Sequence, residues 1–74
     1  MPTTEAFANR LRKARENKSL SRRALAELIQ AGYSALSNYE SGSREPNFAT
    51  TEKLAAALGV SAGWLAFDEG DAHN

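Results

Sequence analysis

Apolar residues recur along this chain at helical spacing, and the strict alternation that marks a half-buried strand is nearly absent. Phe7, Leu11 and Ala14 stand at positions i, i+4 and i+7, which places them on one face of a helix. This pattern predicts a first helix that ends near Lys18.

Two further helical patterns follow, separated by a short break. Ser21 can cap a second helix. The apolar side of this helix consists of Leu25, Ala26, Leu28 and Ile29. Residues 30–32 form the break, and residues 33–40 predict a third helix whose Leu36 and Tyr39 face inward.

A polar loop at 41–46, punctuated by Gly and Pro, separates the third helix from the rest of the chain. Asn47 can cap a fourth helix, and Gly59 can end it in the left-handed conformation. The inner stripe of this helix consists of Phe48, Thr51, Leu54, Ala55 and Leu58. Ser61 can cap a short fifth helix, so the sequence predicts an all-α fold of five short helices.

The length of 74 residues allows one domain, which we expect over 1–70, with a flexible tail at 71–74. The longest strongly apolar run, at 54–58, is far too short to span a membrane. The N-terminus has no apolar signal core, and we expect a cytoplasmic protein.

Catalysis, cofactors and metal binding have little support in the sequence. Cysteine is absent, which excludes disulfides and thiolate metal sites, and His73 is the only histidine. No nucleophile–base pair and no phosphate-cradling Gly loop is evident. We therefore expect no enzyme, no cofactor, no metal and no small-molecule ligand.

The formal net charge is zero, although DNA-binding domains usually carry a basic excess. The charge is nevertheless segregated along the chain, because residues 61–74 carry only acids whereas residues 1–23 are mainly basic. The basic residues of that first segment are Arg10, Arg12, Lys13, Arg15, Lys18, Arg22 and Arg23. This asymmetry fits an electrostatic footprint for nucleic acid, and it equally fits a solvated helix face.

The second and third predicted helices, with the short turn between them, form the pattern of a DNA-binding unit over 21–40. Such a unit needs a small residue where the helices cross, and Ala26 can supply it. It also needs apolar anchors beneath the second helix of the pair, which Leu36 and Tyr39 can supply. The face left outward is polar and consists of Tyr33, Ser34, Ser37 and Asn38.

The chain resembles the phage Cro/repressor-type helix-turn-helix family, often called XRE, from about Phe7 to Leu65. Four pieces in register carry the resemblance: Phe7-x3-Leu11-x3-Arg15, Leu20-Ser21-x3-Leu25-Ala26-Glu27, Leu36-Ser37-x-Tyr39-Glu40-x-Gly42-x-Arg44-x-Pro46 and Leu54-Ala55-x2-Leu58-Gly59-Val60-Ser61-x2-Trp64-Leu65. The resemblance implies a lambda-repressor-like fold and a sequence-specific regulator of transcription. We expect a repressor that binds a palindromic operator in double-stranded DNA as a homodimer.

The resemblance also implies roles for individual residues. The residues expected to contact base edges are Tyr33, Ser34, Ser37 and Asn38. Those expected to contact phosphates are Arg22, Gly42, Ser43 and Arg44, the last three through a loop whose main-chain amides suit phosphate oxygens. Plain structural roles remain open for them, namely a solvated helix face for the serines and a helix-closing turn for Gly42.

Other positions of the family pattern concern architecture. Arg15 and Glu40 match a partly buried ion pair between the first helix and the end of the third. The region of Trp64, Leu65 and Phe67 lines the dimer contact; we expect Trp64 to serve the core and the other two to face the partner. Gln30 stands where the family usually has a Gly with positive φ, so we expect either strain there or a different turn through Gly32.

Two other function classes remain as alternatives. An antitoxin or adaptor that grips a partner protein and regulates its own operon would share this fold. A basic helix at 10–18 that lies on a membrane is disfavoured, because its apolar side is small. The acidic stretch at 68–71 fits a linker to a further domain as well as a natural end.

Overall fold

The computed structural model describes residues 4–69, and within that range the chain forms helices and no strand. The helices are α1 (Thr4–Asn17), α2 (Arg22–Leu28), α3 (Tyr33–Ser41), α4 (Phe48–Leu58) and α5 (Ala62–Phe67). The predicted all-α fold of five short helices is confirmed. The tail predicted at 71–74 lies outside the described residues.

The predicted polar caps set the starts of three helices. The Ser21 hydroxyl accepts from the Ala24 amide at 3.0 Å, and the Ser61 hydroxyl accepts from the Trp64 amide at 3.0 Å. Asn47 Oδ1 accepts from the Thr50 amide at 2.8 Å. Each cap satisfies an amide that has no partner within its own helix, so the helix starts are confirmed as predicted.

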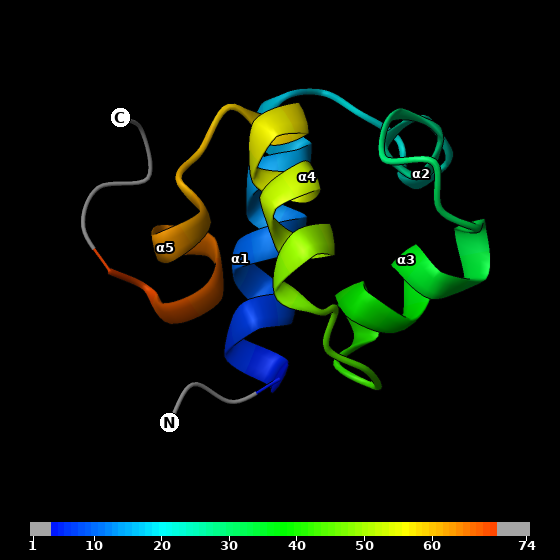
Figure 1. Cartoon of the computed structure of the whole chain (residues 1–74). Helices are drawn as coiled ribbons and strands as arrows, with labels where there is room; N and C mark the ends of the chain where they lie inside the picture. Colours follow the sequence, from blue (N-terminus) through cyan, green and yellow to red (C-terminus); the bar gives the residue numbers. More distant parts are fainter. Residues whose placement is uncertain (1–3, 70–74) are drawn as a thin grey trace.

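The helices enclose one apolar core, with α1 packed against both α3 and α5. In Figure 1, α2 and α3 lie together on one side of the molecule and α5 lies on the opposite side. The core consists of Phe7, Leu11, Ala14, Leu25, Ala26, Ile29, Leu36, Leu54, Ala55, Leu58 and Leu65. This core fixes how α3 is presented, since Leu36 is fully buried beneath it.

Two apolar side chains that we expected to face the core are exposed. Leu28 is 59% exposed and Phe48 is 54% exposed, so these two assignments are wrong. Leu28 comes one residue before the buried Ile29, and one residue corresponds to a rotation of about 100° around the helix, which takes Leu28 off the buried face. Phe48 is the first residue of α4 and comes about one turn before Thr51, the first buried residue of this helix.

Among residues 4–69, no helix has both the length and the hydropathy needed to cross a membrane. Within the same range, no group of acidic or histidine side chains gathers in a way that could hold a metal ion.

Candidate nucleic-acid interface

The pairing of α2 with α3 rests on the residues that the sequence pattern singled out. Ala26 is buried in the core, and its carbonyl accepts a hydrogen bond from the Ala31 amide at 2.9 Å. Leu36 is fully buried under α3, and Tyr39 is half-buried against the same core. α3 is therefore anchored from below, which leaves its other face free of the core.

The turn between α2 and α3 passes through the left-handed conformation at Gln30, where φ is 58°. The Gln30 amide bonds the Glu27 carbonyl at 3.1 Å, and the Ala31 amide bonds back to α2, a pattern that requires a left-handed residue at this point. Gly32 has φ −72° and is the N-cap of α3. The alternative turn through Gly32 is therefore wrong, and Gln30 bears the strain.

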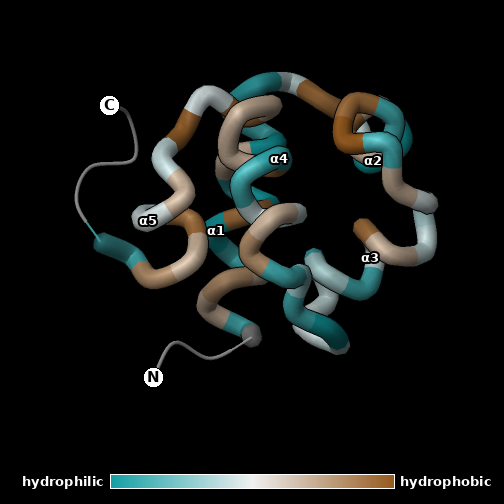
Figure 2. The backbone as a smooth tube through the Cα atoms, viewed as in Figure 1, coloured by the Kyte–Doolittle hydropathy of each residue, from teal (hydrophilic) through white to brown (hydrophobic). Residues whose placement is uncertain are grey.

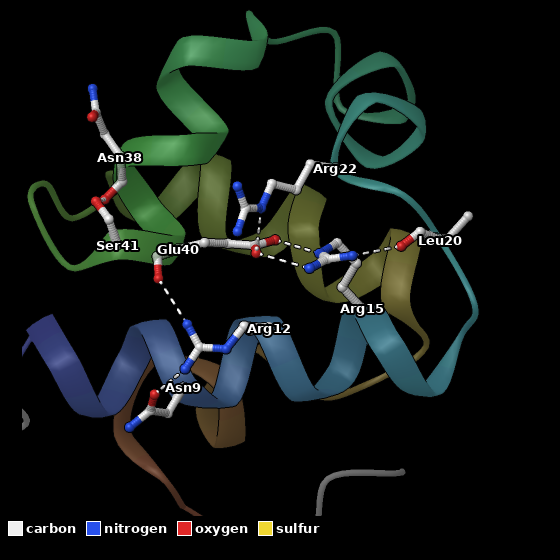
Figure 3. A network of polar contacts seen from close by, with 8 residues as sticks. All are labelled: Asn9, Arg12, Arg15, Leu20, Arg22, Asn38, Glu40 and Ser41. Carbon is white, nitrogen blue, oxygen red and sulfur yellow. Dashed lines mark hydrogen bonds and ion pairs between the residues drawn. The ribbon is translucent and has the colours of Figure 1, made fainter.

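The outer face of α3 carries the residues expected to meet base edges. Tyr33 is 49% exposed, Ser34 is exposed, and Ser37 and Asn38 are half-exposed. In Figure 3 the Asn38 amide points away from the cluster of charged side chains behind α3. All these side chains lie at the surface and can hydrogen-bond, as reading of a groove requires.

Behind α3, the carboxylate of Glu40 binds two arginines (Figure 3). Arg15 of α1 donates from Nε to Oε2 at 2.6 Å and from Nη2 to Oε1 at 3.1 Å. The side chains of Arg15 and Glu40 are only 11% and 1% exposed, so the predicted buried ion pair is present. This bidentate pair ties α1 to the end of α3.

Arg22, the first residue of α2, is the second arginine at Glu40. Its Nε donates to Oε1 at 3.2 Å, while its side chain remains 42% exposed. Hydrogen bonding with the Tyr33 side chain, and then the charge of Glu40, raises the pKa of Arg22 above its ordinary value. Arg22 is thus a held cation at the edge of the surface that α3 presents.

Arg23 is a candidate that the sequence analysis did not assign. Its guanidinium carbon lies 5.9 Å from the centre of the Tyr33 ring, within the range of a cation–π contact. Arg22, Arg23 and Tyr33 line one shallow hollow beside the start of α3. The signal that could have identified Arg23 is its place next to Arg22 at the start of the second predicted helix.

The three arginines of α1 are half-buried, and each donates to a main-chain carbonyl of the same chain. Arg10 donates to the carbonyls of Leu65 at 2.9 Å and Ala66 at 3.1 Å. Arg12 donates to the Glu40 carbonyl at 3.3 Å, and Arg15 donates to the Leu20 carbonyl at 2.8 Å. These three guanidinium groups are therefore engaged within the fold, and the interpretation of residues 1–23 as an electrostatic footprint stays a prediction.

The loop after α3 is hydrophilic in Figure 2 and carries Gly42, Ser43 and Arg44. Gly42 has φ 84° and closes α3, which is the structural role left open for it. The amides of Gly42, Ser43 and Arg44 all turn back to the Asn38 carbonyl. The expectation that these amides face a phosphate is wrong, because they close the helix end; the exposed side chains of Ser43 and Arg44 are what the loop presents outward.

The residues expected at a dimer contact lie in different environments. Leu65 is fully buried in the core of the chain, so the expectation that it faces a partner is wrong. Trp64 is half-buried against the core, as expected. Phe67 is 53% exposed and shares a hollow with the exposed Phe48.

Comparisons with known proteins agree with this geometry. The sequence model of a family described as "Helix-turn-helix domain" matches residues 8–70. The SPbeta prophage-derived uncharacterized HTH-type transcriptional regulator YonR of Bacillus subtilis (strain 168) is 36% identical over 59 residues, which cover 80% of this chain and 55% of that protein.

The fold also matches a solved structure, the crystal structure of an HTH_3 family transcriptional regulator from Vibrio cholerae. The TM-score is 0.78 at 29% identity, and the match covers 89% of this chain and 37% of that one. The chain therefore spans only part of the length of each relative. Helix-turn-helix regulators are a non-enzymatic family, in agreement with the expectation that this chain is no enzyme. These matches, together with the turn and the anchored α3, show that the chain belongs to the helix-turn-helix family, in its XRE type.

Proposed function

We propose that this chain is the DNA-binding domain of a transcriptional regulator, and that it recognises specific double-stranded DNA through α3. One observation carries the proposal: α3 is fixed by buried Leu36 and Glu40 and turns Tyr33, Ser34, Ser37 and Asn38 outward. A helix held in this way can enter a major groove, whose base edges present distinct donors and acceptors.

In this proposal each polar group of the surface has its own task. Asn38 pairs with an adenine edge, the serines bond neighbouring edges, and Tyr33 contacts a thymine methyl or a phosphate. Arg22, Arg23 and the side chain of Arg44 contact phosphates. Cations near phosphates release counterions, so binding weakens as salt rises.

We further propose that the regulator is a homodimer on a palindromic operator, with half-sites about 34 Å apart along the DNA. The support is the pair of exposed aromatic residues Phe48 and Phe67, which line one hollow together with Phe7 and Pro46. Aromatic side chains, Phe included, are enriched in the buried part of protein interfaces. Bound at a promoter in the cytoplasm, such a dimer would block polymerase and repress transcription.

The same aromatic pair is what favours the second candidate function, an antitoxin or adaptor. An exposed apolar patch can hold a different protein as well as a second copy of this chain. The oligomeric state decides between the two: Phe67→Ser turns a dimer into a monomer if the patch joins two copies. If the wild-type chain sediments as a monomer both alone and on DNA, the result favours the antitoxin or adaptor function over the homodimer.

The experiment that tests the proposal is selection of bound sites from random duplexes, carried out with the wild type and with Asn38→Ala. We expect the wild type to enrich a palindromic sequence. We expect Asn38→Ala to lose about 1–3 kcal/mol of affinity and to relax the preference at one base position in each half-site. No enrichment, or an equal loss on every sequence, contradicts base reading by α3.

A further inference from the structure

The carboxylate of Glu40 serves two arginines that differ in their freedom. Arg15 binds both oxygens, through Nε at 2.6 Å and Nη2 at 3.1 Å, and is almost wholly buried. Arg22 binds one oxygen through Nε alone, at 3.2 Å, and keeps a partly exposed side chain. Figure 3 shows Glu40 between the two guanidinium groups, which come from α1 and from the start of α2.

This arrangement leaves a positive charge at the surface. One carboxylate neutralises one guanidinium, and Arg15, with two bonds to Glu40, is the closer partner. Arg22 therefore keeps its charge for a further anion, while its Nε–H is already used and its orientation is restricted. Tyr33 also shares this guanidinium, so the Nη hydrogens that remain beside Tyr33 are the ones that can meet an anion.

The position of Arg22 matches that task. Arg22 lines the shallow hollow beside the start of α3, with Ser21, Arg23 and Tyr33 as neighbours. A phosphate beside a recognition helix lies at such an edge, because the helix occupies the groove and the backbone flanks it. The groups that hold Arg22 are thus placed before any DNA binds.

We infer that Glu40 is a positioning residue for DNA binding: it holds Arg22 by Nε, so that the Nη groups of Arg22 meet a backbone phosphate. Through Glu40, the buried pair with Arg15 links the packing of α1 to the phosphate contact of α2. The inference rests on the proposed function, and it adds to it the device that orients one phosphate contact.

A double-mutant cycle on DNA binding tests this role. The variants are Glu40→Gln, Arg22→Gln and both together, with affinity measured for a fixed mixed-sequence duplex at several salt concentrations. Phosphate contacts do not depend on sequence, so no operator is needed. The free energy of unfolding of every variant is measured in urea, so that affinity is compared among folded proteins only.

Loss of the Glu40 charge by itself strengthens the attraction to DNA. The test therefore compares the change in affinity caused by Glu40→Gln between two backgrounds, one with Arg22 and one with Gln at that position. Glu40→Gln changes DNA affinity by some factor in the wild type and by another factor in the Arg22→Gln variant. We expect the factor to be about tenfold less favourable in the wild type, which is within the usual coupling of contacting residues. Equal changes in both backgrounds would mean that Glu40 acts on stability alone, and would overturn the inference.

A second pair of variants decides the matter if Glu40→Gln does not fold. Arg22→Lys keeps the charge but loses the Nε–H and the fork, so we expect about tenfold weaker binding with an unchanged salt slope. Arg10→Lys is the matched control, because Arg10 is also an arginine but bonds the carbonyls of Leu65 and Ala66 and has no proposed DNA contact; we expect about a twofold loss or less. Equal losses for the two variants overturn the inference. A wild type that binds no duplex even at low salt overturns the proposed function and the inference with it, whereas salt-dependent binding without coupling overturns the inference alone.

Discussion

The arginines of α1 and the arginines of α2 carry the same charge but differ in how far they are exposed and in what they bond. Arg10, Arg12 and Arg15 extend from α1 to carbonyl oxygens on neighbouring segments or to the Glu40 carboxylate. Arg22 and Arg23, at the start of α2, keep surface beside Tyr33. The arginines of this chain therefore divide by their surroundings: those of α1 are engaged within the fold, and those of α2 keep the exposed surface that the proposed function assigns to DNA.

The packing of each helix explains the division. α1 is in contact with both α3 and α5, so long side chains from its flanks reach the carbonyl groups at the ends of those helices. These carbonyls have no partner within their own helix and accept a cation readily. At the start of α2, Ser21 and Arg23 are exposed and Arg22 is half-buried, so its arginines stay at the surface of the molecule. A charge count along the sequence averages over both situations.

The comparison predicts its largest effect on stability at Arg15. Replacing it by alanine leaves the buried Glu40 carboxylate without its bidentate partner, and we expect the free energy of unfolding in urea to fall by about 3–5 kcal/mol. Arg23→Ala is the control and should change stability by less than about 0.5 kcal/mol, as a surface residue does. A small effect at Arg15 would place it among the surface arginines instead.

A smaller effect is expected at Arg10. Arg10→Ala removes two hydrogen bonds, to the carbonyls of Leu65 and Ala66, that tie α1 to α5. We expect a loss of about 1–2 kcal/mol, since the group is only partly buried. The measurement is urea unfolding, and the salt dependence of DNA binding should stay unchanged. A flatter salt slope in this variant would assign Arg10 to DNA and not to the fold.

The smallest effect concerns the turn that sets the arginines of α2 relative to α3. Gln30 adopts φ 58°, a conformation that glycine reaches without the strain of a side chain. We expect Gln30→Gly to raise the free energy of unfolding by about 0.5–1 kcal/mol and to leave DNA affinity unchanged. A destabilised variant would indicate that the glutamine side chain itself supports the turn.

Local rules predicted most of the fold. Helical spacing gave the buried face of α1, and the caps at Ser21, Asn47 and Ser61 placed three helix starts, because both depend on neighbours along the chain. The errors occur where a side chain lies at the rim of the core. Leu28 and Phe48 fit an apolar pattern, but only the packed structure shows that the core ends before it reaches them.

The candidate site could be predicted in part. The outward polar face of α3 followed from Leu36 and Tyr39 beneath it, and the resemblance placed the Arg15–Glu40 pair. Three features were not predicted. They are the bond that adds Arg22 to the Arg15–Glu40 pair, the position of Arg23 over the Tyr33 ring, and the bonds from the amides after α3 to the Asn38 carbonyl. These features depend on side-chain directions and on distances between helices, which spacing along the chain does not specify.

The measurement that tests the division most directly is the slope of the logarithm of DNA affinity against the logarithm of salt concentration. It compares the wild type with two variants, Arg10→Gln and the double variant Arg22→Gln with Arg23→Gln. We predict an unchanged slope for Arg10→Gln and a slope flatter by about two units for the double variant, since each lost phosphate contact removes about one. Equal slopes for the wild type and the double variant, or a flatter slope for Arg10→Gln, would contradict the account.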